Sequence, residues 1–236
     1  MPREPLRKSH VGIKLNDRSS KMEKRLVAAM KMVADTIRND YGLTAKIEKR
    51  IYLDDIVEEM RERYKGSKAQ FGLAYEGKER TYMQPDGGFM WIEEWGVEPR
   101  RFVLVAEAKR QGTNDVRQKE GKKKQGRGNA VERMGKNMRG VDALFLGEGI
   151  TPFVAYGEGC DFDPKASSIT DRVATLNGFF PLNTTFVEKV QVEGETLKPV
   201  SLYFREKPWT PREMYDPLMD VARRTIAYYK KKYKLR

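Results

Sequence analysis

Residues 100–109, RRFVLVAEAK, constrain the fold of this chain more than any other segment. Five consecutive apolar residues, Phe102 to Ala106, leave neither face of a strand for water. Such a run is typical of a central strand in a sheet that is covered on both sides. Helical and strand patterns alternate along the rest of the chain without a clear linker. We therefore predict a single α/β domain over residues 1–236.

The other elements follow from the same patterns. Helical spacing predicts helices over residues 19–41, from 54 or 55 to 66, from Asn129 onward, over 167–180 and from 210 to the end. Alternating or apolar runs predict a short strand in 44–53, two strand pieces in 81–94, a buried strand in 151–159 and a strand in 198–207. Thr210 should cap the last helix, with Pro211 at its first position, and we expect Pro217 to bend or interrupt it.

Charge and composition limit the function. The chain has 46 Lys and Arg against 34 Asp and Glu, a net charge of +12, with a pI near 9.6. This surplus favours a polyanionic partner, nucleic acid first and an anionic membrane second, although a merely basic protein remains open. The single cysteine, Cys160, and the single histidine, His10, exclude an intrachain disulfide and a Cys/His zinc site.

The termini and the hydropathy favour a soluble intracellular protein. No apolar run approaches the roughly 18 residues of a membrane span. The first ten residues, MPREPLRKSH, lack the apolar core of a signal peptide. Residues 1–16 read as a polar arm, and residues 113–127 as a basic, glycine-rich loop. Hydrolytic chemistry in this chain would have to use carboxylates, lysine and a metal.

Two charged residues follow the apolar run at a strand end. Alternate side chains of a strand point the same way, so Glu107 and Lys109 share one face. Asp86 lies in a turn 21 residues before Glu107, and a hairpin would bring it back beside that residue. Two carboxylates and an ammonium group in one space suit Mg²⁺, which could polarise a phosphoryl oxygen and lower the pKa of a bound water.

Lys109 has two possible roles in such a site. It could stabilise negative charge on the attacking oxygen or the phosphate. It could instead help to deprotonate the water if its pKa were depressed. The structural alternative is a salt-bridged Glu–Lys pair at a strand end.

The motifs PDGG, VLVAEAKRQG and GNAVER, between about residues 84 and 137, resemble the EcoRI family of type II restriction endonucleases within the PD-(D/E)xK nuclease superfamily. The resemblance implies a mixed sheet of about five strands flanked by helices, assembled as a homodimer. It implies Asp86, Glu107 and Lys109 as catalytic residues. The expected metal ligands are Asp86, Glu107 and the backbone carbonyl of Ala108, with Mg²⁺ as cofactor and Mn²⁺ as a substitute.

The same resemblance implies a reaction and a partner. Family members cut both strands of a short palindrome in double-stranded DNA and leave 5′ overhangs. A companion adenine methyltransferase of the same specificity is implied, in a prokaryotic cytoplasm. Two rivals stay open: another PD-(D/E)xK nuclease, structure-specific or for repair, and a non-enzymatic basic DNA-binding protein.

GNAVER matches the family's major-groove element, and its chemistry can be argued separately. Gly128 permits close backbone approach, and Asn129 has the donor and acceptor that suit adenine. Ala130 offers a methyl-sized contact to thymine. Glu132 can accept from an exocyclic amino group, and Arg133 can donate to purine N7 or to a phosphate. Asn129 and Glu132 also fit a helix N-capping box, and the two roles can coexist.

Arg127 distinguishes this chain within the family. The run GRGNA is similar to that of the relative that cuts CAATTG, and arginine is the commonest bidentate reader of guanine. We therefore expect an AATT centre with an outer G·C pair read by Arg127. CAATTG comes first, while GAATTC, a degenerate outer pair or bare AATT remain open. The alternative role of Arg127 is a phosphate contact.

Basic residues around these motifs, together with one glutamine, are candidates for contacts to the DNA backbone. They are Arg110, Gln111, Lys119, Lys122, Lys123 and Lys124. The four lysines could contact phosphates or form an arm that DNA orders, or they could be a solvated charge run. Phosphate contacts would make binding steeply salt-dependent.

Overall fold

The structure, a computed structural model, describes residues 17–63, 82–96, 100–110, 120–121, 129–145, 148, 150–159 and 202–235. The predicted arm over 1–16, most of the predicted basic loop over 113–127 and the predicted helix over 167–180 lie outside these ranges. Within them, no helix combines the length and the apolar character needed to cross a bilayer.

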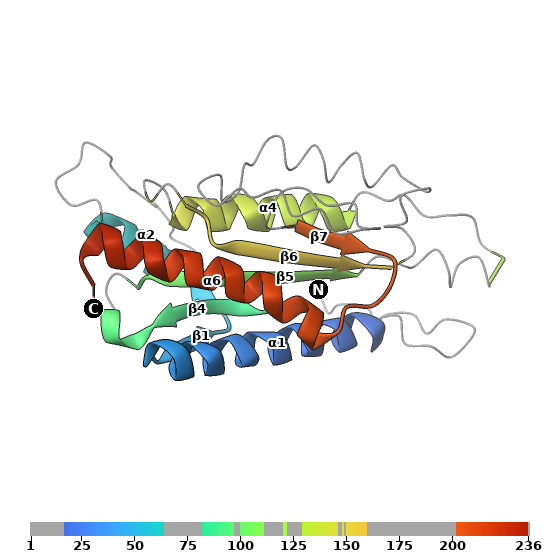
Figure 1. The fold of residues 1–236 in the computed structure, drawn as a ribbon. Helices are drawn as coiled ribbons and strands as arrows, with labels where there is room; N and C mark the ends of the chain where they lie inside the picture. The colour runs from blue at the N-terminus through green and yellow to red at the C-terminus, as the bar shows by residue number, and fades with distance from the viewer. Residues whose placement is uncertain are drawn as a thin grey trace.

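A five-stranded mixed sheet forms the centre of the fold (Figure 1). Its order is β1 (Ala45–Glu48), β4 (Gly88–Ile92), β5 (Phe102–Arg110), β6 (Phe153–Glu158) and β7 (Leu202–Arg205). The pairs β1–β4 and β4–β5 are antiparallel, whereas β5–β6 and β6–β7 are parallel. The apolar run lies in the central strand and is buried on both faces, so the predicted mixed sheet is confirmed.

Helices cover both faces of the sheet. Helices α1 (Asp17–Tyr41) and α6 (Pro211–Tyr233) pack against each other and against β5 (Figure 1). Helix α4 (Asn129–Leu144) packs with a second group of sheet residues. Val105 of β5 belongs to this second cluster, while Ala106 and Ala108 belong to the first. Glu107, two residues after Val105, therefore lies on the α4 side.

Residues 44–53 form two strands rather than the predicted one. Strand β1 pairs with β4, and β2 (Ile51–Tyr52) pairs with β3 (Tyr82–Met83) in a separate two-stranded sheet. Lys49 and Arg50 separate the strands, and Ile51 is buried in the second cluster, which lies on the α4 side of the sheet. Helix α2 (Leu53–Arg63) then begins with Asp54 and Asp55 in its first turn, where carboxylates are favourable.

The last helix begins as expected. The Thr210 hydroxyl accepts from the backbone of Glu213, whose carboxylate accepts from the backbone of Thr210, and Pro211 is in the first turn. Helix α6 continues through Pro217, so the proline does not interrupt it, and a bend there stays a prediction. Met214 before it and Leu218 after it are both fully buried, and this packing holds the helix on the sheet through the proline.

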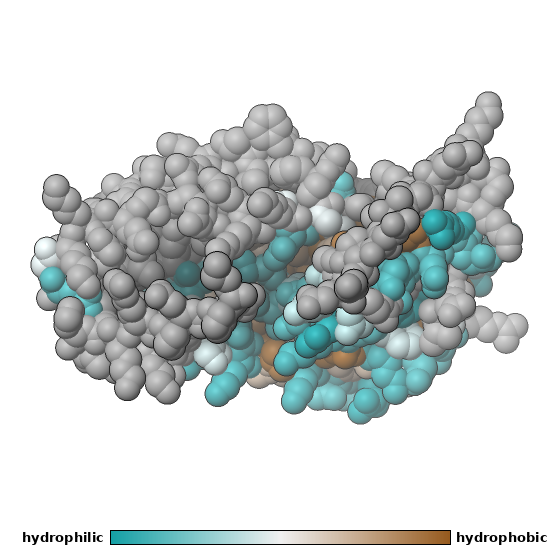
Figure 2. Space-filling model, turned by 180° about the vertical axis from the view of Figure 1, so that it is seen from behind, coloured by the Kyte–Doolittle hydropathy of each residue, from teal (hydrophilic) through white to brown (hydrophobic). Residues whose placement is uncertain are grey.

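The described surface seen from behind is mostly hydrophilic, with small separate hydrophobic areas (Figure 2). Among the described residues, the large hydrophobic side chains that are exposed are Val27, Ile47 and Tyr82. They belong to α1, β1 and β3, respectively. Isolated residues of this kind are normal on a protein surface and need no partner to explain them.

Candidate active site

Asp86 is carried into the site by the turn that precedes β4. The amide of Gly88 donates to the carbonyl of Pro85 at 3.0 Å, and the amide of Gly87 donates to the carbonyl of Ala106 at 2.9 Å. In the β4–β5 pairing, Gly88 stands opposite Ala106. The hairpin on which the return of Asp86 depended is therefore present.

The two glycines of the turn are required by space and by backbone angle. A Cβ atom at Gly87 would lie 2.8 Å from the Cβ atom of Ala106. Gly88 has a φ of +80°, and a Cβ atom there would lie 2.7 Å from the carbonyl oxygen of Glu48. Larger residues would push the turn away from β5, and with it Asp86.

The three predicted residues meet in space. Lys109 Nζ lies 3.3 Å from Asp86 Oδ2 and also forms an ion pair with Glu107 Oε1. The backbone amide of Asp86 donates to Glu107 Oε2 at 3.0 Å. The amide of Ala108 donates to Asp86 Oδ2 at 3.2 Å. Turn and strand thus hold both carboxylates beside one ammonium group.

Burial and charge set the electrostatics of the cluster. Glu107 is 1% exposed, and burial raises its pKa against the lowering effect of Lys109, while the charge of Asp86 raises it further. Burial alone would lower the pKa of Lys109, but the charges of Glu107 and Asp86 outweigh it and raise that pKa. The two carboxylates thus favour the ammonium form of Lys109.

The donor set fits a hard divalent cation. Asp86 and Glu107 supply carboxylate oxygens, and Ala108, between Glu107 and Lys109, supplies a backbone carbonyl. The charge of Asp86 also raises the pKa of Glu23 in α1, after the effect of burial, so negative charge accumulates here. The described residues contain no group of three Asp, Glu, His or Cys side chains arranged to hold a metal. Waters and substrate oxygens would complete the coordination.

Two further residues of the site were not predicted. Asn137 Nδ2, from α4, donates to Glu107 Oε1 at 2.8 Å. Its signal in the sequence is a polar residue beside Met134, Met138 and Val141, which form the buried stripe of α4. Glu23 is exposed on α1 and has no comparable signal, because it belongs to the polar face of that helix.

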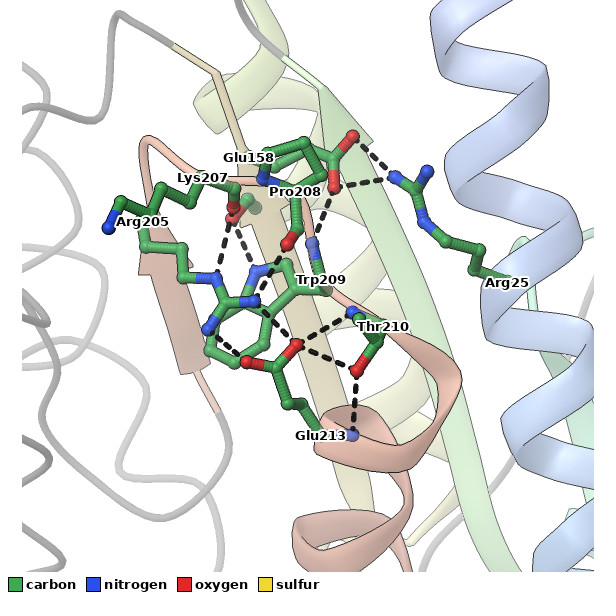
Figure 3. Close-up of polar contacts among 9 residues, drawn as sticks. Arg25, Glu158, Arg205, Lys207, Pro208, Trp209, Thr210 and Glu213 are labelled. Carbon is green, nitrogen blue, oxygen red and sulfur yellow. Dashed lines mark hydrogen bonds and ion pairs between the residues drawn. The ribbon is translucent and has the colours of Figure 1, made fainter.

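A second buried carboxylate lies beside the site, one strand away. Glu158 of β6 is the partner of Arg110 in the β5–β6 register. Its oxygens accept from Arg25 Nη2 at 2.6 and 2.7 Å and from the backbone of Trp209 at 3.0 Å (Figure 3). Arg110 Nε lies 3.9 Å from Glu158, and its side chain is 15% exposed. Arg110, expected at the DNA backbone, is thus mostly buried against this carboxylate.

Most of the predicted DNA-contacting residues lie outside the described part. These are Gln111, Lys119, Lys122, Lys123, Lys124, Arg127 and Gly128. Asn129, Ala130, Glu132 and Arg133 belong to the first turns of α4, as the predicted helix start at Asn129 requires, but their side chains also lie outside it. The structure therefore places the start of the proposed recognition helix and not its base contacts.

Comparison with known proteins agrees with this geometry. The family model described as restriction endonuclease EcoRI matches residues 8–236. The type II restriction enzyme RsrI of Cereibacter sphaeroides is 27% identical over 184 residues, 63% of this chain and 64% of the relative. The type II restriction enzyme EcoRI of Escherichia coli is 26% identical over 177 residues, 59% of this chain and 62% of the relative.

The matched region thus spans a little under two thirds of each curated relative. The family match, in contrast, extends over nearly the whole chain and includes the turn, the central strand and α4. This chain belongs to the EcoRI family of restriction endonucleases.

Proposed function

We propose that this chain is a type II restriction endonuclease that hydrolyses DNA phosphodiester bonds with Mg²⁺, for which Mn²⁺ can substitute. The observation that carries the proposal is the convergence of Asp86, Glu107 and Lys109 on one hairpin of an EcoRI-family chain. A salt-bridged pair at a strand end explains Glu107 and Lys109 alone. It does not explain why a second carboxylate is held against them by the backbone of Ala108.

Each residue has a role that its surroundings support. Asp86, Glu107 and the carbonyl of Ala108 would hold the metal, which supplies charge to stabilise the transition state and to acidify a water. Lys109, whose ammonium group lies beside both carboxylates, would stabilise negative charge on the phosphate. The turn and the central strand hold these groups before DNA arrives, so little reorganisation is required.

The recognition site follows from residues 127–133. Asn129, Ala130, Glu132 and Arg133 would read an AATT centre in the major groove, with Gly128 allowing close approach. Arg127 would read an outer guanine, which favours CAATTG over GAATTC, a degenerate outer pair or bare AATT. Lysines 119 and 122–124, with Gln111, would contact the backbone, whereas Arg110 is mostly buried against Glu158.

The assembly completes the proposal. A homodimer would cut both strands of the palindrome and leave 5′ overhangs. A separate adenine methyltransferase of the same specificity would protect host DNA, and the enzyme would act in a prokaryotic cytoplasm. The net charge of +12 supports a DNA partner.

Two other functions predict different behaviour. A structure-specific or repair nuclease of the PD-(D/E)xK superfamily would keep Asp86, Glu107 and Lys109 but has no need of GNAVER. A non-enzymatic DNA-binding protein has no use for a 1% exposed carboxylate that shares the Lys109 ammonium group with a second carboxylate. The family match and the carboxylate pair together favour the restriction enzyme.

The test is digestion of a sequenced plasmid with Mg²⁺, followed by sequencing of the fragment ends. Asp86→Asn is the key variant, because it keeps the size of the side chain and removes its charge. Asp216→Asn is the matched control, since Asp216 is 66% exposed on α6. We expect discrete fragments with 5′-AATT ends from the wild type and the control. Cleavage by Asp86→Asn should fall by at least about 100-fold.

The other outcomes separate the alternatives. Discrete CAATTG cuts support guanine reading by Arg127, and indifference to the outer pair reduces Arg127 to a phosphate contact. A smear that depends on Asp86 would keep the nuclease and refute the recognition argument. DNA binding without cleavage in either Mg²⁺ or Mn²⁺ would leave only the DNA-binding protein.

A further inference from the structure

Glu107 is held by donors from three different elements. Lys109 of β5 and the backbone of Asp86, in the turn before β4, contact its two oxygens. Asn137 of α4 donates to Oε1 at 2.8 Å, and α4 is a separate helix that is not part of the β4–β5 hairpin. The carboxylate is therefore oriented from outside the unit that carries the acid-acid-lysine residues.

Asn137 differs from the other side-chain donor in charge. The Lys109 ammonium neutralises Glu107 but would repel a divalent cation at the same oxygens. The Asn137 amide can fix the direction of the carboxylate without opposing a cation. Donors of this kind, which hydrogen-bond a ligating carboxylate, set its orientation in metal sites generally.

The packing of α4 determines where Asn137 lies. Met134 and Met138 are fully buried against the sheet, and Val141 is 1% exposed. Asn137 lies on the same face, three residues after Met134, and is half-buried. A polar residue on a packed helix face loses water, so its amide requires the partner that Glu107 provides.

We infer that Asn137 is a positioning residue that aims the Glu107 carboxylate for metal binding and ties its orientation to the place of α4 on the sheet. The inference rests on the proposed function. Helix α4 begins at Asn129, inside the proposed recognition segment, and Asn137 follows eight residues later, about 12 Å along the helix. A rigid helix thus joins the proposed base-reading residues to the proposed metal ligand.

The experiment uses Asn137→Leu, which removes the donor and keeps a similar volume. Leucine would extend the apolar stripe of α4, so the variant should unfold at the same urea concentration as the wild type. Asn39→Ala is the control, because Asn39 is an exposed asparagine on another helix, α1. Duplex affinity in EDTA should stay within about threefold of the wild type, since no DNA-contacting residue is changed.

Four readouts test the role. The cleavage rate of Asn137→Leu at the cognate site should fall about 10- to 100-fold, and the Mg²⁺ concentration for half-maximal rate should rise by a similar factor. Mn²⁺ can be titrated by calorimetry into the complex of each protein with a duplex whose scissile bond cannot be hydrolysed. The complex of Asn137→Leu should bind Mn²⁺ more weakly than that of the wild type. The cleavage rate at a site with one changed base pair should fall less than the rate at the cognate site. The ratio of the cognate rate to the changed-site rate should therefore become smaller.

The outcomes are separable from those of the proposed function. Wild-type rates and Mn²⁺ affinity in Asn137→Leu, with discrete cutting by the wild type, would overturn the inference alone. An equal loss at cognate and changed sites would overturn the link to α4. A lower urea midpoint that accounts for the lost activity would also overturn it. Failure of the wild type and of Asn39→Ala to cut would overturn the proposed function, and the inference with it.

Discussion

Replacing Glu158 by glutamine should destabilise the protein substantially, although the shapes of the two side chains match. The Glu158 side chain is 4% exposed, and both of its oxygens accept from Arg25 Nη2. One oxygen also accepts from the backbone of Trp209. A glutamine offers one oxygen and turns an NH₂ group toward these donors, so the Arg25 charge loses its partner in a mostly buried position.

The magnitude follows from this burial. Breaking a buried ion pair by removing one partner costs about 3–5 kcal/mol. The Arg25 side chain is 27% exposed, and its partial contact with water reduces the estimate to about 2–3 kcal/mol. For a chain of this size, each kcal/mol shifts Tm by about 2–4 °C, so Tm should fall by about 5–10 °C.

Urea unfolding followed by circular dichroism would measure the difference in the free energy of unfolding. The control is Asp216→Asn, which breaks the exposed Arg212–Asp216 pair of α6. Exposed pairs of this kind contribute at most about 0.5 kcal/mol. If Glu158→Gln lost no more stability than this control, the buried Arg25–Glu158 pair would contribute no more to the free energy of unfolding than an exposed pair. The argument from burial would then be refuted.

Two further perturbations test the turn and the start of α6. Gly87→Ala should cost about 1–3 kcal/mol in urea unfolding, because its Cβ atom would meet that of Ala106; an unchanged midpoint would show that the turn relaxes freely. Hydrogen bonds from Arg205 lower the pKa of Glu213 to about 2 from 4.5. Because the folded-state pKa is depressed, the stability that Glu213 contributes is present above pH 4.5 and lost as pH falls toward 2. The urea midpoint of the wild type should therefore converge on that of Glu213→Gln over this range, and a constant difference would contradict the assignment.

The sequence predicted the parts of the site that depend on local patterns. The run from Phe102 to Ala106 identifies a doubly covered strand, and the Pro-Asp-Gly-Gly turn marks the start of β4, the strand that pairs with it. Together they place Asp86, Glu107 and Lys109 near one another, as the structure does. Local periodicity and turn chemistry are sufficient for this, because all three residues belong to one supersecondary unit.

Contacts between distant segments were not predictable in the same way. Arg25 and Glu158 are 133 positions apart, and nothing in either neighbourhood indicates the pairing. Asn137 reaches Glu107 because α4 turns the face that carries Met134, Met138 and Val141 toward the sheet, and Asn137 lies on that face. Likewise, the pattern of residues 44–53 predicts one continuous strand. The segment is divided because its first part pairs with β4 and its second part pairs with β3.

The mixed sheet has a consequence for the order of folding. The β4–β5 pairing closes a short stretch of chain, and loop-closure entropy makes such local contacts fast to form. The β6–β7 pairing is parallel and joins strands whose nearest ends, Glu158 and Leu202, are 44 positions apart. The hairpin with Asp86, Glu107 and Lys109 can therefore form early, while β7, which pairs with β6 at the edge of the sheet, must wait for a long connection. Substitutions in the hairpin should slow folding, whereas those in β7 should mainly accelerate unfolding.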